Sequence, residues 1–291
     1  MSTSAAPSDR KKVTTLHLKQ MKAKGQPITM LTAYDFATAQ AIDRAEIDII
    51  LVGDSLGMVV LGYETTLPVT MDEMIHHAKA VARGARLALL VGDMPFLSYQ
   101  VSTEEAVRNA GRFLQEAGMD AVKLEGGRER RAAVEAIVGA GIPVMGHLGL
   151  TPQSVHQLGG FRPQARDEAA AVRLVEDAEI LQEAGCFALV FESIPGRLAE
   201  LVSRRIEIPT IGIGAGVGCD GQVLVTHDLL GLFDRFTPHF VKRYAQLHAA
   251  MSQAFLAYRQ DVTARHFPAA EHTVEMTDET WQAVMARLGS G

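Results

Sequence analysis

The chain has 291 residues, of which 47% are hydrophobic and 21% are charged, a balance typical of a globular protein and not of a disordered one. Asp and Glu (34) outnumber Lys and Arg (28), and the net charge of -6 provides no general attraction to nucleic acid or to an anionic membrane. Two cysteines are too few for a disulfide scaffold, no apolar run approaches the roughly 20 residues that cross a bilayer, and residues 1–12 lack the apolar stretch of a signal peptide. We therefore expect a soluble cytoplasmic protein whose partners include neither nucleic acid nor a membrane.

Strand-like apolar runs alternate with helical patterns from about residue 28 to residue 225, which is typical of βαβ units around a parallel sheet. Residues 13–24 precede the first run and have the pattern of a short amphipathic helix that plugs the N-terminal mouth of the fold. Capping boxes at Thr70-x-x-Glu73 and Ser102-x-x-Glu105 each predict the start of a helix between strands. The predicted strands are 28–32, 48–53, 87–92, 121–124, 143–146, 188–191, 210–213 and 223–225, and a third intervening helix is predicted over 167–184.

About eight strand–helix units in a chain of this length favour a closed (β/α)8 barrel, which takes roughly 250 residues, although a doubly wound open sheet would show the same alternation. Residues 115–125 (QEAGMDAVKLE) and 182–192 (QEAGCFALVFE) resemble each other, which supports a repeated unit. We interpret residues 1–273 as a single barrel domain in which residues 1–12 are disordered.

The C-terminal part of the chain becomes helical after about residue 230, with Tyr244, Leu247, Met251 and Phe255 on one stripe. Residues 274–291 form a C-terminal extension with a further helical pattern over 278–288. The sequence therefore predicts a barrel with an N-terminal capping helix and a C-terminal helical extension.

Polar residues follow several predicted strands at the point where each strand ends. In a parallel barrel the carboxyl ends of all strands meet at one face, which carries the function. Because side chains alternate along a strand, Lys123 and Glu125 share a face, and the inward face suits this polar pair. The residues expected at this mouth are Asp54, Ser55, Asp93, Lys123, Glu125, His147 and Glu192.

Several carboxylates at one mouth repel one another unless a cation neutralises them. Carboxylate oxygens without a Cys/His cluster suit a hard ion such as Mg²⁺, and zinc is disfavoured because His147 stands alone. A single Asp after a strand is equally well explained as a helix N-cap or an Asx turn, but four acids together are not. Lys123 alone would be a salt-bridge partner of Glu125, whereas beside a metal it would hold an anionic group of the substrate.

Other motifs carry weaker signals. The glycine-rich run 211–216 (IGIGAG) lacks the Lys-Ser/Thr of a P-loop and does not follow the first strand of its unit, so a tight turn with close backbone approach is favoured over a nucleotide site. The pair His76-His77 lies in a predicted helix and is interpreted as surface or packing residues. No matching base accompanies Cys219, and Ser55 is not in a G-x-S-x-G elbow, so neither is expected to be a nucleophile.

Taken together, these motifs closely resemble the ketopantoate hydroxymethyltransferase (3-methyl-2-oxobutanoate hydroxymethyltransferase) family over about residues 13–273. The blocks that carry the resemblance are MLTAYD (30–35), VGDSLGMV (52–59), YETT (63–66), VGDMPF (91–96), VKLEG (122–126), GHLGLTP (146–152), ESIP (192–195), GIGAG (212–216) and CDGQV (219–223). The resemblance implies a (β/α)8 barrel that binds Mg²⁺, uses 5,10-methylenetetrahydrofolate as one-carbon donor and assembles as a homodecamer of two pentameric rings. It further implies the transfer of a hydroxymethyl group to 3-methyl-2-oxobutanoate, giving ketopantoate for pantothenate synthesis.

The resemblance also assigns roles to individual residues. It makes Asp54 and Asp93 direct magnesium ligands and places Glu125 at the metal site, in direct contact or through water. It has Asp54, Ser55, Asp93 and Lys123 contact the keto acid. The family's general base corresponds to Glu192. Two further family positions near the site correspond to His147 and Tyr34, without a defined role.

Two rival functions stay open at this stage. A magnesium-dependent barrel of the isocitrate lyase or phosphoenolpyruvate mutase kind would also chelate a 2-keto acid, and a catalytically silent keto-acid binding protein would keep the same fold. Family members typically end near residues 267–273, so the extension over 274–291 is a departure. With Trp281, Met285 and Leu288 at amphipathic spacing, this extension either docks on a neighbouring subunit or is a frayed tail.

Overall fold

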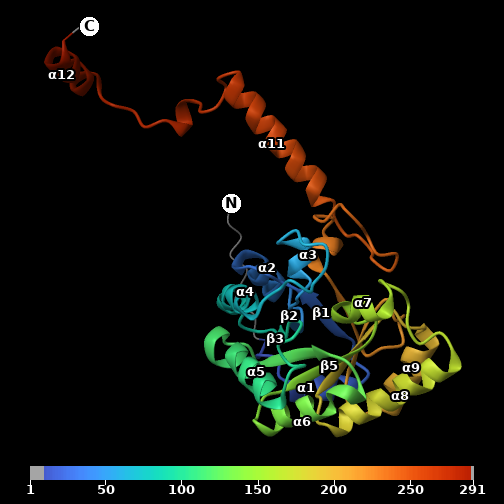
Figure 1. Ribbon diagram of the computed structural model, residues 1–291. Helices are drawn as coiled ribbons and strands as arrows, with labels where there is room; N and C mark the ends of the chain where they lie inside the picture. The colour runs from blue at the N-terminus through green and yellow to red at the C-terminus, as the bar shows by residue number, and fades with distance from the viewer. Residues whose placement is uncertain (1–9, 290–291) are drawn as a thin grey trace.

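A computed structural model, which describes residues 10–289, shows eight parallel strands that close into a barrel in chain order (Figure 1). Its first strand pairs with both the second and the eighth, with Met30 opposite Ile49 on one side and Val223 on the other. The doubly wound alternative is therefore excluded. The strands are β1 (Ile28–Thr32), β2 (Ile49–Val52), β3 (Leu89–Asp93), β4 (Ala121–Glu125), β5 (Val144–Gly149), β6 (Ala188–Glu192), β7 (Thr210–Ile213) and β8 (Gly221–Leu224).

All eight predicted strands are present, with ends that differ by a few residues from the expected ones. The difference matters at β4, β5 and β6, which run further than predicted and include Glu125, His147 and Glu192. The third strand likewise ends on Asp93. These four polar side chains are thus fixed by strand hydrogen bonds and not by flexible loops.

Helices cover the outside of the barrel, and local capping sets where several of them begin. At α4 the Thr70 hydroxyl accepts from the Glu73 N–H while the Glu73 carboxylate accepts from the Thr70 N–H at 2.7 Å, the complete capping box that was predicted. At α5 only the Ser102 half of the box forms, and Gly118 ends the helix in the left-handed conformation. The outer helices are α2 (Phe36–Arg44), α4 (Met71–Gly84), α5 (Thr103–Ala117), α6 (Arg131–Gly139), α8 (Glu168–Glu183) and α9 (Gly196–Arg205), with short turns α3 (Leu56–Val59), α7 (Val155–Leu158) and α10 (Thr226–Leu229).

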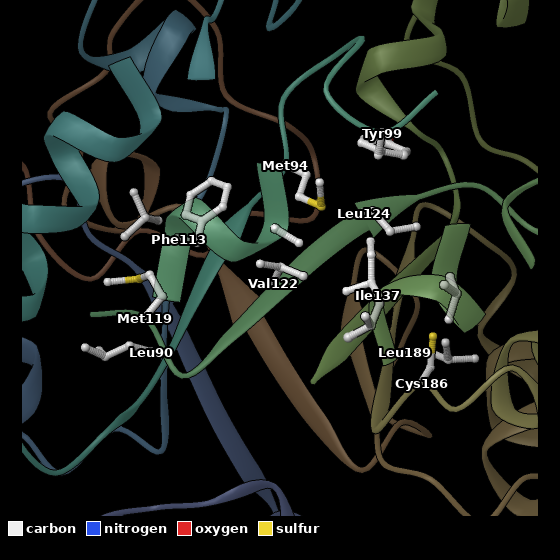
Figure 2. Packing of buried hydrophobic residues seen from close by; sticks show 14 of the residues in the cluster. Leu90, Met94, Tyr99, Phe113, Met119, Val122, Leu124, Ile137, Cys186 and Leu189 are labelled. Carbon is white, nitrogen blue, oxygen red and sulfur yellow. The ribbon is translucent and has the colours of Figure 1, made fainter. Parts of the chain in front are cut away.

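The hydrophobic core has two parts. Outside the barrel, apolar side chains pack between strands and helices, and Figure 2 shows Phe113, Leu124 and Ile137 in this layer. Inside the barrel, strand residues such as Met145 pack with Leu18 and Met21 of α1 (Thr15–Ala23). The predicted N-terminal helix therefore exists and plugs the barrel interior, as expected.

The two ends of the chain differ from expectation. Lys12 donates to the Ala88 carbonyl at 2.8 Å and pairs with Asp120, and Arg10 pairs with Asp48, so the disorder predicted for residues 1–12 does not extend to Arg10 and Lys12. A buried carboxylate partner fixes Arg10 in a way that composition alone does not reveal. Residues 1–9 lie outside the described part.

After β8 the chain leaves the barrel. The helices α11 (Leu247–Thr263) and α12 (Asp278–Leu288), with the short turn η3 (Ala270–His272) between them, extend away from it (Figure 1). No residue of α11 is buried. The helical pattern predicted after about residue 230 was wrong for residues 231–246, which lie outside any helix. Tyr244 is among them, and its N–H donates to the Leu229 carbonyl. Among residues 10–289, no helix combines the length and apolarity that crossing a bilayer requires.

Packing around Gly92 gives a test of the outer core. A Cβ at Gly92 would lie 2.3 Å from the Phe113 ring, so the ring of α5 packs directly on the backbone of β3. Gly92→Ala is expected to lower the free energy of unfolding by about 1–3 kcal/mol through overpacking. The control is Gly111→Ala in α5, the helix that carries Phe113, where a Cβ would meet nothing within 4 Å. This change should instead raise stability by about 0.5–1 kcal/mol. Equal denaturation midpoints for the two variants would contradict this account.

Candidate active site

One cavity of about 320 Å³ opens at the carboxyl ends of the strands. Every residue predicted for the mouth of the barrel lines it: Asp54, Ser55, Asp93, Lys123, Glu125, His147 and Glu192. Tyr34 is not part of the lining. It is buried behind Ser55, and the two hydroxyl oxygens lie 2.8 Å apart. Tyr34 can therefore orient Ser55 but does not face the cavity itself.

Strand register brings the first acids and the lysine together. Asp93 at the end of β3 lies opposite Lys123 of β4, and the Lys123 Nζ is 2.8 Å from the Asp93 Oδ1. The other oxygen, Oδ2, accepts from the backbone N–H of Asp54 at 3.2 Å. Asp54 follows β2, so three neighbouring strands supply this group.

Burial and mutual repulsion change how these acids titrate. Burial raises the pKa of the Asp54 carboxyl well above its usual value, and the nearby carboxylates of Asp93 and Glu125 raise it further. Burial also raises the pKa of Asp93, although the Lys123 ammonium opposes part of that change. For Lys123 the balance is reversed, because burial disfavours its charge but the surrounding carboxylates more than offset this and raise its pKa. Lys123 is therefore a charged ammonium within the site.

His147 connects the two glutamates of the site. Its Nδ1 lies 3.4 Å from the Glu125 Oε1 and its Nε2 lies 3.3 Å from the Glu192 Oε2. Burial and the Lys123 charge both lower the pKa of His147, but its interactions with Glu125 and Glu192 outweigh them and raise it to about 9. Each ring nitrogen faces one carboxylate, and Nδ1 also lies 3.4 Å from the Lys123 Nζ. The raised pKa favours the charged imidazolium at neutral pH.

Gln153 organises the acids, and the sequence analysis missed it. Its side-chain amide donates to the Asp54 Oδ2 and to the Met94 carbonyl, both at 2.9 Å. Its backbone N–H donates to the Glu125 Oε2 at 3.0 Å, and its amide oxygen accepts from the Tyr99 hydroxyl at 2.7 Å. A neutral glutamine in the short 3-10 helix η2 (Pro152–Ser154) offers no charge pattern, and its only signal was its place directly after the block that ends in Thr151-Pro152.

The donor set suits Mg²⁺. Four carboxylates face two cationic groups, Lys123 and His147, which leaves two negative charges uncompensated when all are ionised. Within the described residues, no three His, Cys, Asp or Glu side chains form a ready-made metal cluster. Mg²⁺ does not need one, because it binds through one or two carboxylates and keeps water or substrate in its other positions. Asp54, Asp93 and Glu125 all line the cavity and are the carboxylates that would hold the ion.

A parallel (β/α)8 barrel with acids, a lysine and a histidine at the carboxyl ends of its strands defines a barrel enzyme with its chemistry at that face. Residues 12–270 match the model of the ketopantoate hydroxymethyltransferase family, and the chain belongs to this family. It is 58% identical over 266 residues to the 3-methyl-2-oxobutanoate hydroxymethyltransferase of Syntrophus aciditrophicus (91% of this chain, 98% of the relative). It is 59% identical to the enzyme of the same name from Moorella thermoacetica (91% and 99%).

Solved structures resemble the chain in fold. A phosphonopyruvate hydrolase in complex with oxalate and Mg²⁺ superposes with a TM-score of 0.59 at 14% identity, covering 94% of this chain and 99% of that one. Phosphoenolpyruvate phosphomutase from Streptomyces platensis subsp. rosaceus also gives 0.59 at 14% identity, covering 94% and 98%. At this identity the likeness shows a shared barrel alone, so the isocitrate lyase and phosphoenolpyruvate mutase alternative is matched only as a fold.

The Gln153 contacts lead to a measurable expectation. Gln153→Ala removes the amide that holds Asp54 and the shorter of the two hydrogen bonds that the buried Tyr99 hydroxyl donates, so stability should fall by about 1–3 kcal/mol. Chemical denaturation measures this loss. The control is Gln26→Ala, the same change at an exposed position after α1, which should stay within about 0.5 kcal/mol of the unchanged chain. A Gln153→Ala midpoint equal to that of the control would mean that the network contributes nothing to the fold.

Proposed function

We propose that the protein transfers a hydroxymethyl group from 5,10-methylenetetrahydrofolate to 3-methyl-2-oxobutanoate, giving 2-dehydropantoate and tetrahydrofolate in pantothenate biosynthesis. Membership of the ketopantoate hydroxymethyltransferase family supports the reaction. The observation that carries the proposal is that one cavity brings together Asp54, Ser55, Asp93, Lys123, Glu125 and Glu192. A silent binding protein would have no need of so many buried acids, which are costly to keep together.

In this proposal the keto acid binds with its charged end among the buried acids. Mg²⁺, when bound at Asp54 and Asp93, would act as a Lewis acid toward the keto and carboxylate oxygens of the substrate. Lys123 supplies a fixed positive charge for the substrate carboxylate, because the carboxylates around it keep it protonated. Ser55 offers a hydroxyl at the cavity wall, and Tyr34 orients it from behind.

In this proposal Glu192 is the general base. Its side chain is 16% exposed, against 3% for the side chains of Asp93 and Glu125, so it is the more accessible acid to an incoming C3–H bond. Glu192 takes the C3 proton, and the protonated His147 beside it orients its carboxylate. The carbanionic C3 then forms a bond to the one-carbon unit, and the two bonds from that carbon to the folate nitrogens break. Water supplies the new hydroxyl group, and the two freed nitrogens take up one proton from that water and the one that Glu192 removed from C3.

The proton-transfer step is tested by Glu192→Gln. Loss of the base should reduce exchange of the substrate C3 proton with deuterated solvent at least about a hundredfold, since general base catalysis contributes roughly 10²–10⁴-fold. Proton NMR of 3-methyl-2-oxobutanoate with Mg²⁺ follows the exchange without folate. Calorimetric titration of the same keto acid should show that binding is retained.

Unimpaired exchange in Glu192→Gln would remove Glu192 as the base. The full reaction of the unchanged protein separates the rival functions, since carbon–carbon cleavage or phosphonate chemistry without added folate would favour an isocitrate lyase or phosphoenolpyruvate mutase kind of enzyme. A folded protein that binds the keto acid but shows neither exchange nor product would be the silent binder.

We also infer that the chain works as a homodecamer in the cytoplasm. The apolar stripe of α11 supports self-association, because Met251, Phe255 and Tyr258 are 45%, 64% and 61% exposed on a helix that leaves the barrel. Phe255→Glu should therefore reduce the mass measured by light scattering below that of the unchanged chain. Gln253→Glu, on the opposite side of the same helix, should leave the mass unchanged. Equal masses for both variants would contradict a role of this stripe in assembly.

A further inference from the structure

The cavity continues past the acids into a second region that the proposed chemistry does not use. Two loops form it, one between β5 and α8 (residues 150–167) and one after β8 (residues 230–246). Their aromatic side chains Phe161, Phe233, Phe236 and Phe240 line the same cavity as the acids. A keto acid of five carbons, with its charged end among the acids, is too small to cover the apolar surface of all four phenylalanines.

Two of these phenylalanine rings are partly exposed to solvent. Phe161 is 50% exposed and Phe236 is 64% exposed, although both line a cavity wall. Aromatic side chains that are rigid and half-exposed within a cavity provide stacking surfaces for a planar ligand. Since α1 fills the interior from the other end, a second ligand approaches the acids from the end of the barrel where these rings line the cavity.

Backbone geometry fixes one of the rings. Gly214 has φ +63°, and a Cβ there would lie 2.7 Å from the Phe240 ring. The glycine-rich turn after β7 therefore forms a flat surface on which Phe240 rests. The sequence predicted that the backbone of the glycine-rich run 211–216 lies close to another group. That group is the Phe240 ring of the second loop.

Positive charge accompanies the aromatic rings. Arg162 follows Phe161 directly, and Lys242 comes two residues after Phe240, in a chain whose net charge is -6. Both side chains are exposed, and within the described residues neither forms a salt bridge with an acid. Both are sequence neighbours of residues that line the cavity, and the Lys242 Nζ lies 4.9 Å from the centre of the Tyr244 ring. Cations near a cavity attract an anionic ligand.

We propose that these two loops bind the reduced folate, with its pteridine ring against Phe161, Phe236 and Phe240 and its anionic glutamate tail near Arg162 and Lys242. The inference rests on the proposed function, because it assigns the place of that reaction's second substrate. A reduced folate has both features that these loops would bind. Its planar heteroaromatic ring would lie on the aromatic side chains, and its carboxylate tail would point toward the basic residues. The one-carbon unit then faces inward, toward the acids.

The test measures the two substrates separately on the full chain. Phe236→Ala, at a position that is 64% exposed and outside the core, and Phe240→Leu should each raise the KM for 5,10-methylenetetrahydrofolate roughly tenfold, as expected for a lost stacking contact. The KM for 3-methyl-2-oxobutanoate, measured by C3 exchange without folate, should rise less than about twofold. Phe36→Leu, at the start of α2 and outside the cavity, is the matched control and should change neither value.

The charged part is tested by the double variant Arg162→Gln and Lys242→Gln, which should raise the folate KM several-fold and weaken its dependence on salt. An unchanged folate KM in the phenylalanine variants, or an equal rise for both substrates, would overturn the proposal. If the unchanged protein shows neither exchange nor transfer, the proposed function fails instead, and equilibrium dialysis of tetrahydrofolate against the same variants still decides whether the loops bind it.

Discussion

The cost of holding four carboxylates in one buried mouth governs the rest of this structure. Like charges at close range in a low-dielectric site oppose folding unless cations or hydrogen-bond donors compensate them. The barrel supplies Lys123 against Asp93, a protonated His147 against Glu125 and Glu192, and the Gln153 amide against Asp54. Two negative charges remain when all four acids are ionised, because the Gln153 amide at Asp54 is neutral and His147 faces two glutamates. A divalent cation would neutralise them, so the charge imbalance that opposes folding also favours binding of a metal ion.

Strand register is how the barrel achieves this compensation. In the parallel pairing, Asp93 lies opposite Lys123 and Glu125 opposite His147, so each acid meets a base on the neighbouring strand. A slip of one residue would turn each of these side chains toward the helices. The apolar residues one step earlier, such as Val122 and Leu124, face the outer core and hold that register in place.

These pairings explain which parts of the site could be predicted from the sequence. Two-residue alternation is a local rule, so Lys123 and Glu125 could be assigned to one face, and the common edge of parallel strands then placed Asp54, Asp93 and Glu192 beside them. Gln153 and Tyr99 could not be found in this way, because their contribution is a set of hydrogen bonds between loops distant in sequence. Tyr244 was misplaced for a related reason: a single long-range hydrogen bond to Leu229 overrode a periodic pattern. Arg10 was likewise expected to be disordered, although tertiary contacts hold it.

The plug that α1 forms inside the barrel has a kinetic consequence. With one end filled by Leu18 and Met21, both substrates of the proposed reaction would enter from the carboxyl ends of the strands, where the cavity lies. If the loops hold the folate as proposed, a keto acid bound among the acids would lie beneath it, and binding would be ordered: the keto acid would enter first, and tetrahydrofolate would leave before the hydroxylated acid. Excess folate would then act as a dead-end inhibitor, because folate that binds first would block access to the acids.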